Sequence, residues 1–222
     1  MEARLTEIDR RMALRFLGLR GGADEALMAR LSSCEAKLRL AARPRVLWRL
    51  FAREADGTLR GTGFRPRGDA IARRLKGCDA VILMAATLGS GVERLIRRAQ
   101  ATDMSEALLL DACGSAAIEN VCDNLCADLA ERFRPQALTE RFSPGYGDFP
   151  LEQQRALFAV LDVTRRIGIT LSAGGVMLPQ KSVTALVGVS DAPLPGRKSD
   201  CVACSMRDRC AFRKDGIICA VK

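Results

Sequence analysis

The longest helical pattern in the sequence, over residues 103–133, limits the possible folds more than any other segment. Its apolar side chains recur at steps of three and four residues, as on a helix that buries one stripe. They are Ile118, Val121, Cys122, Leu125, Leu129 and Phe133. Pro135 follows closely and ends the pattern. We therefore expect one long helix here with one buried face.

Shorter segments supply further helices and several strands. Periodicity and turn signals predict helices at 2–17, 23–42, 69–76, 150–163 and from the turn 88–91 to Gln100. Strands are expected at 46–53, 58–64, 79–87, 168–171 and 181–190, with Asp56-Gly57 joining the first two as a hairpin. Because helices and strands do not alternate regularly, we expect an α+β fold with helices packed on a largely antiparallel, twisted sheet.

The composition indicates one well-buried domain with a short appendage. Of the 222 residues, 48% are hydrophobic and 27% are charged, as in ordinary globular proteins. We assign residues 1–190 to the domain and residues 191–222 to a linker and a cysteine-rich tail. No stretch has the length and apolarity of a signal peptide or membrane span, so we expect a cytoplasmic protein without a membrane partner.

Histidine is absent from the whole sequence, and the charge is unevenly distributed. The first fact excludes Ser-His-Asp and Cys-His catalytic arrangements and favours a binding protein, so we predict no catalytic residue. Residues 1–100 carry 21 basic and 11 acidic side chains, whereas residues 101–196 carry 7 and 12. The basic residues are dispersed and aromatic residues make up only 5%, so we expect no nucleic-acid partner.

The segment most informative about function is residues 141–148, which read RFSPGYGD. Proline and glycine impose an irregular backbone that can direct carbonyls and amides at a ligand. Arg141 offers a planar fork suited to a carboxylate, and the ring of Tyr146 could attract a cation such as a sulfonium. The alternative is an ordinary turn with a buried tyrosine and a surface arginine.

Residues 141–146 resemble the Arg-Pro-Ala-Pro-Gly-Tyr loop of the activation domain of cobalamin-dependent methionine synthase, which holds S-adenosylmethionine. Residues 85–89 (AATLG), 111–119 (DACGSAAIE) and 177–183 (MLPQKSV) are similar to the free-standing, smaller members of that family. The resemblance extends over roughly residues 80–190. It implies the fold of that activation domain.

The resemblance also implies a ligand site. Arg141 would pair with the carboxylate of S-adenosylmethionine, and the backbone at Ser143 and Gly145 would contact its adenosine part. Tyr146 would close over the ligand, and Glu119 would meet its ammonium or adenine amino group. Small residues at 114–117 leave the helix nearly bare beside Glu119, which would admit a ligand or, alternatively, tight packing on the sheet.

By this resemblance, the chain is a reactivation subunit for a cobalamin-dependent methionine synthase. It would present S-adenosylmethionine to the cobalamin that the partner holds. After oxidation to cob(II)alamin, this cobalamin needs one electron and a methyl group. The protein alone would not turn over. A flavodoxin-like electron donor could bind the basic first half. Alternatives are a reactivation factor for another corrinoid methyltransferase and a non-catalytic sensor of S-adenosylmethionine or metal.

Two further segments have possible binding roles. Cys201, Cys204, Cys210 and Cys219 have the spacing C-x2-C-x5-C-x8-C, which suits zinc or an iron–sulfur cluster, with reduced thiols as the alternative. Residues 87–91 (TLGSG) could present amides to an anion at the start of a helix. They lack the known nucleotide-binding patterns, so a structural turn is the other interpretation.

Overall fold

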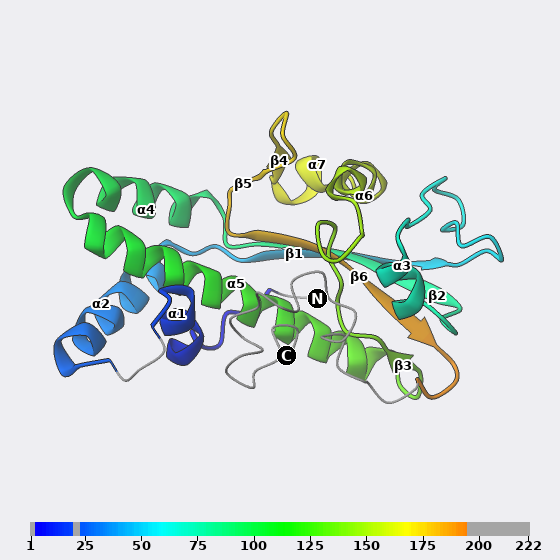
Figure 1. Ribbon diagram of the computed structural model, residues 1–222, viewed down its shortest axis with the longest axis horizontal. Helices are drawn as coiled ribbons and strands as arrows, with labels where there is room; N and C mark the ends of the chain where they lie inside the picture. The colour runs from blue at the N-terminus through cyan, green and yellow to red at the C-terminus, as the bar shows by residue number, and fades with distance from the viewer. Residues whose placement is uncertain (1–2, 20–22, 195–222) are drawn as a thin grey trace.

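A four-stranded antiparallel sheet forms the centre of the protein and carries helices on both faces (Figure 1). The computed structural model describes residues 3–19 and 23–194. The strand order is β1-β2-β6-β3. The strands are β1 Arg45–Ala52, β2 Ala80–Thr87, β6 Ser182–Ser190 and β3 Ala137–Leu138. The predicted α+β class with a largely antiparallel sheet is confirmed.

The two central strands, β2 and β6, are buried on both faces because helices cover both sides of the sheet. Ile82 of β2 lies opposite Val187 of β6, and both side chains belong to one apolar core. The neighbouring pair, Leu83 and Leu186, belongs to the other core. This alternation follows from the two-residue period of a strand. It places Val183, Ala185, Val187 and Val189 on one face of β6, against the first core.

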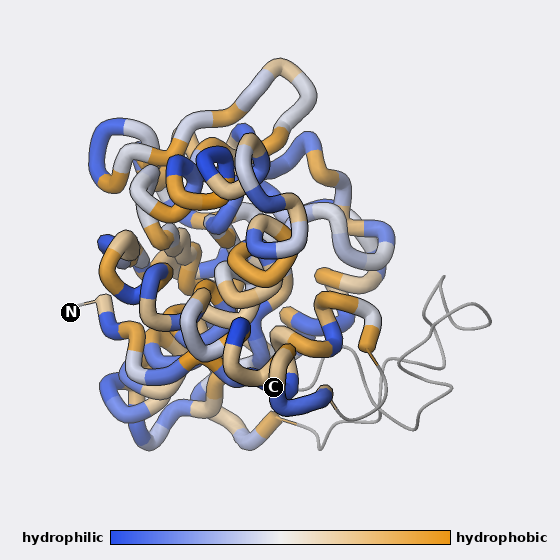
Figure 2. The backbone as a smooth tube through the Cα atoms, turned by 90° about the vertical axis from the view of Figure 1, so that its left-hand side faces the viewer, coloured by the Kyte–Doolittle hydropathy of each residue, from blue (hydrophilic) through white to orange (hydrophobic). Residues whose placement is uncertain are grey.

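The larger helical layer is built around α5, Met104–Arg132. It also contains α1 Arg10–Phe16, α2 Glu25–Ala41 and α4 Ser90–Thr102. The predicted stripe of α5 is buried from Ile118 to Leu129, with Phe133 partly buried at its end. Hydrophilic and hydrophobic stretches alternate along the coiled segments of the backbone (Figure 2). Among the helices of the described residues, none is both long and apolar enough to cross a membrane.

The opposite face of the sheet carries shorter elements (Figure 1). They are α3 Asp69–Arg74, the 3-10 turn Leu151–Gln153, α6 Gln154–Leu161, α7 Val163–Ile167 and the small ribbon of β4 Thr170–Leu171 with β5 Met177–Leu178. The helix predicted over 150–163 is found as this 3-10 turn and α6, and it ends at Leu161, slightly earlier than expected. Asp162 adopts φ 54° and separates α6 from α7.

The predicted turn at Asp56-Gly57 is present, because the Glu54 amide donates to the Thr58 carbonyl at 2.9 Å, but the strand predicted over residues 58–64 is wrong. Strand β1 pairs along its whole length with β2, and residues 58–64 form no strand beyond an isolated bridge from Arg53 to Leu59. Gly61 and Gly63 have positive φ angles of 75° and 66°, which interrupt an extended segment.

The first predicted helix, residues 2–17, begins only at Arg10. The Asp9 side chain accepts hydrogen bonds from the amides of Arg11 and Met12 and so caps α1. The preceding segment is bound to α5 instead, because the Thr6 amide donates to Asn120 Oδ1 at 3.0 Å. A tertiary contact thus replaces the helical hydrogen bonds that periodicity alone predicts.

We predict that Gly91→Ala destabilises the fold. A Cβ atom at position 91 would lie 2.2 Å from the carbonyl oxygen of Ala41, where α4 begins against the end of α2. Relief requires backbone movement, so we expect the free energy of unfolding to fall by about 1–3 kcal/mol in urea denaturation. Gly174→Ala is the control, because no atom but Ser172 Oγ, at 4.0 Å, lies near its Cβ position. Equal stability of the two variants would contradict the close approach.

Candidate ligand site

Arg141 lies between two carboxylates of α5. Its Nη1 donates to Asp123 Oδ1 at 2.6 Å, and its Nη2 forms a short contact with Glu119 Oε2. Glu119 and Asp123 are four residues apart, so both point from one face of the helix toward the guanidinium. The arginine side chain is 14% exposed, against 34% and 31% for the two carboxylates. Arg141 is therefore mostly buried, and its partners lie at the rim.

The edge of the sheet explains why Arg141 points at α5. Beyond β3 the chain continues along β6, and Phe142 exchanges both backbone hydrogen bonds with Leu186 at 2.9 Å. In such an extended segment, successive side chains point to opposite faces. Arg141 therefore reaches the α5 layer, while Phe142 packs against the other core and stacks on Phe149 with ring centroids 6.2 Å apart.

The neighbours of Arg141 keep it charged. Burial is the largest single influence and would lower the pKa of Arg141, but its net shift is upward, and Glu119 and Asp123 are the charged neighbours that raise it. Burial also raises the pKa of the Cys122 thiol, which is therefore neutral at physiological pH. The two carboxylates consequently supply the compensating charge. Cys126 lies beside Arg141 on the next turn of α5, and burial raises its pKa as well.

The turn after Arg141 contains the other predicted ligand residues. The amide of Tyr146 donates to the Ser143 carbonyl at 3.3 Å, and the amide of Gly145 donates to the Phe149 carbonyl at 2.8 Å. Gly145 has φ 92°, a conformation that disfavours other residues. Tyr146 is 64% exposed, so the expectation of a buried tyrosine under the ordinary-turn interpretation is wrong. Its ring lies 6.3 Å from that of Phe142.

Asp148 binds this turn to the rest of the protein. Its two carboxylate oxygens accept from the amides of Asp69 at 2.7 Å and Ala70 at 2.8 Å, which are the first residues of α3. The preceding Gly68 has φ 123° and no side chain that could cap the helix. A carboxylate at a helix N-terminus satisfies free amides and favours the helix dipole. The turn is thus held at both ends, by Asp148 and by the pairing of Phe142 with β6.

The bare stretch of α5 near Glu119 lies under a lysine. The side-chain carbons of Lys181 cross Gly114, where an added Cβ would meet them at 3.1–3.4 Å. Lys181 Nζ lies 2.8 Å from Asp111 Oδ1 and donates to Ser115 Oγ at 2.9 Å. Ala116 and Ala117 are buried in the core. Tight packing therefore accounts for these small residues, with Glu119 at the rim.

Asp123 and Cys126 lie against Arg141 but were not among the predicted site residues. The i, i+4 spacing from Glu119 to Asp123 was visible in the sequence, and a second carboxylate on the face of Glu119 was a usable signal. The structure brings Glu119 and Arg141 into direct contact and places Ser143, Gly145 and Tyr146 in the adjoining turn.

The four tail cysteines predicted as metal ligands, Cys201, Cys204, Cys210 and Cys219, lie outside the described residues. Within residues 3–19 and 23–194, no group of three or more Cys, Asp or Glu side chains is arranged to hold a metal ion. The five cysteines in that part of the chain are free thiols, four of them buried.

Comparison with known proteins relates this chain to a known fold. The chain is similar to the crystal structure of the MetH reactivation domain bound to AdoHcy, with a TM-score of 0.59 over 98% of this chain and 85% of that one. The two share a fold. Sequence identity is 16%, so the likeness concerns the fold alone. No protein-family model and no curated protein matches the sequence.

The cap formed by Asp148 predicts acid sensitivity. Hydrogen bonds from the amides of Ala70 and Asp69 lower the pKa of Asp148 below the ordinary value of an aspartate. The folded state then binds fewer protons than the unfolded state, so this contribution is present above the unfolded pKa and is lost as pH falls through the folded pKa. Asp148→Asn should therefore lose stability relative to the natural protein near neutral pH, and the difference should shrink as pH falls below about 4.

Urea denaturation across an acidic pH series measures this difference. The control is Glu152→Gln, which removes an exposed carboxylate from the turn before α6. A pH-independent difference for Asp148→Asn, or the same pH trend in Glu152→Gln, would show that the cap is not the cause.

Proposed function

We propose that this protein binds S-adenosylmethionine at Glu119, Arg141 and the turn Ser143–Gly145–Tyr146, and serves as a reactivation subunit for a cobalamin-dependent methionine synthase. The observation that carries the proposal is the contact of Arg141 with Glu119 beside the exposed Tyr146. It is supported by the fold shared with the MetH reactivation domain, whose structure contains AdoHcy.

The chemical groups of the site fit the polar ends of this ligand. A guanidinium can bind the ligand carboxylate through two parallel hydrogen bonds, and Glu119 can accept from an ammonium or amino group. The exposed face of Tyr146 can attract a sulfonium cation. When bound, S-adenosylmethionine supplies an electrophilic methyl group on its sulfur. The protein's role is to hold and orient it, which needs no general base.

Arg141 already has two carboxylate partners, so ligand binding requires an exchange. A ligand carboxylate at Nη1 would replace Asp123, whose side chain is 31% exposed and can turn toward water. The ligand carboxylate then replaces that of Asp123, so the guanidinium of Arg141 always has a carboxylate partner. This avoids the high free-energy cost of an isolated buried cation. Glu119 would remain on Nη2 and face the cationic part of the ligand.

The same proposal assigns the partner and the tail. The partner is a corrinoid protein that carries cobalamin, and a flavodoxin-like protein is the proposed electron donor. Zinc or an iron–sulfur cluster at Cys201, Cys204, Cys210 and Cys219 stays a prediction.

The first test is calorimetric titration of the protein with S-adenosylmethionine. We expect saturable one-site binding that Arg141→Ala weakens at least tenfold, about 1.4 kcal/mol. Tyr146→Ala should also weaken it, while Phe16→Ala, which removes another half-exposed ring on α1, should not. Thermal unfolding of each variant identifies any loss caused by misfolding. Saturable binding that Tyr146→Ala and Arg141→Ala leave unchanged in folded protein would refute this site.

A second test separates the roles of the two carboxylates. Asp123→Asn frees Nη1 of Arg141, so we expect S-adenosylmethionine to bind equally well or more tightly. Glu119→Gln removes the charge that would face the cationic end, so we expect about tenfold weaker binding, again near 1.4 kcal/mol. The two variants remove equal charge from neighbouring turns and control for each other. Equal weakening by both would mean that the ion network only supports the fold.

A further inference from the structure

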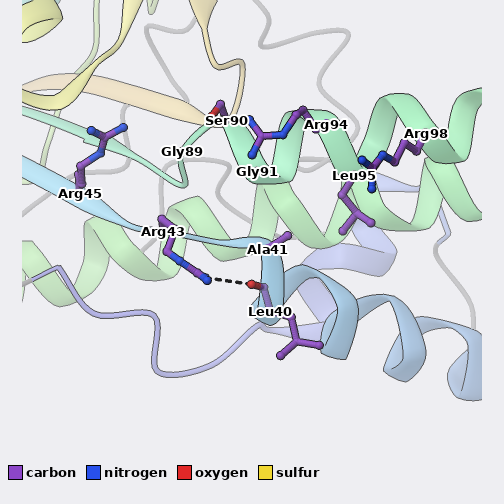
Figure 3. A pocket seen from close by; sticks show the side chains of 10 residues that line it. All are labelled: Leu40, Ala41, Arg43, Arg45, Gly89, Ser90, Gly91, Arg94, Leu95 and Arg98. Atoms are coloured by element: carbon purple, nitrogen blue, oxygen red, sulfur yellow. Dashed lines mark hydrogen bonds between the residues drawn. The ribbon is translucent and has the colours of Figure 1, made fainter.

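A cavity of about 550 Å³ lies away from the proposed ligand site, where α4 begins beside the end of α2 and the start of β1 (Figure 3). Its volume falls within the usual range for small-molecule sites. It is lined by Leu40, Ala41, Arg43, Arg45, Gly89, Ser90, Gly91, Arg94, Leu95 and Arg98. None of these residues belongs to the proposed S-adenosylmethionine site, so the two sites can be tested independently.

The lining of the cavity combines four arginines with no carboxylate. Arg94 and Arg98 extend from successive turns of α4, and Arg43 and Arg45 come from the segment that enters β1 (Figure 3). None of the four forms an ion pair with any residue in the described part of the chain, whereas Arg97, also on α4, pairs with Glu93. Four arginines therefore line one hollow without a carboxylate partner among the described residues, and the guanidinium of Arg45 lies against Gly168 at its margin.

The hydrogen bonds of these arginines leave their charges available. Arg94 Nη1 donates to Ser90 Oγ at 2.8 Å, and Arg43 Nη1 donates to the carbonyls of Leu40 at 2.9 Å and Ala42 at 2.7 Å. All three acceptors are neutral, so the bonds orient the guanidinium groups without neutralising them. Each guanidinium keeps further N–H donors for a ligand.

The backbone beneath the arginines is closely packed. An added Cβ at Gly91 would lie 2.2 Å from the Ala41 carbonyl oxygen, and one at Gly89 would lie 3.1 Å from that of Arg43. The start of α4 and the segment before β1 are thus held together, and the arginines project from a fixed base. The lining contains no aromatic side chain on which a nucleic-acid base could stack.

We propose that this cavity binds a compact phosphate-bearing anion, with Arg43, Arg45, Arg94 and Arg98 as the binding residues. Planar guanidinium forks match the oxygens of a phosphate group, and several of them around one hollow favour a multiply charged anion. The same chemistry is offered by free pyrophosphate and by the phosphates of a small phosphorylated metabolite.

The test is calorimetric titration of the full chain with pyrophosphate at fixed ionic strength. We expect saturable one-to-one binding that the double variant Arg94→Gln/Arg98→Gln weakens at least tenfold. The matched control, Arg97→Gln/Arg165→Gln, removes two positive charges that pair with carboxylates elsewhere, and should change the affinity less than twofold. Thermal unfolding checks that both double variants remain folded.

A parallel titration with ADP distinguishes the two sources. Equal affinity for ADP and pyrophosphate assigns the cavity to the phosphates alone, and at least tenfold tighter binding of ADP assigns it to a phosphorylated nucleoside. If both double variants weakened pyrophosphate binding equally, the loss would follow from net charge alone, and the proposal would be overturned. A pyrophosphate titration without saturable binding would also overturn the proposal. The same holds if an acidic polypeptide such as polyglutamate binds and pyrophosphate does not.

Discussion

The packing of α5 on the β2–β6 strand pair determines where the other elements and the candidate site lie. Ala112, Ala116 and Ala117 of α5 are buried in the core that α5 shares with β2 and β6, and such small side chains allow a close approach. Close packing brings the helix within reach of side chains from the sheet edge. Lys181 can therefore cross Gly114 to Asp111, and Arg141 can reach Glu119. Larger residues on this face would separate both cations from their carboxylates.

The ion network around Arg141 is compatible with both stability and binding. A buried cation is costly unless paired, and the network supplies two carboxylates that lie at the rim, where water can replace a ligand when it leaves. Such a site is preorganised because the guanidinium is already desolvated and oriented. In the proposed function, the ligand carboxylate only replaces that of Asp123. Most of the free energy of binding would therefore come from the contacts of the ligand with Tyr146 and Glu119.

The two proposed sites use opposite edges of the sheet. The turn after Arg141 lies along β6 on the side of β3, whereas the cavity adjoins the start of β1. Their electrostatics also differ. The first pairs one arginine with two carboxylates, and the second collects four arginines from the basic first half of the sequence. This contrast suits a ligand carrying charges of both signs at the first site and an anion at the second.

The sequence by itself determined the elements whose signals are local. The stripe of α5, the apolar strand β2 and the alternation in β6 each follow from periodicity that burial imposes on a regular backbone. Residues 141–146 could also be recognised, because proline and glycine restrict the local backbone. Only the tertiary structure decided the pairing of β1 with β2, the contact of Asp123 with Arg141 and the grouping of four arginines around one cavity. These join segments far apart in the chain, and their free energy comes from packing and charge compensation that no local pattern encodes.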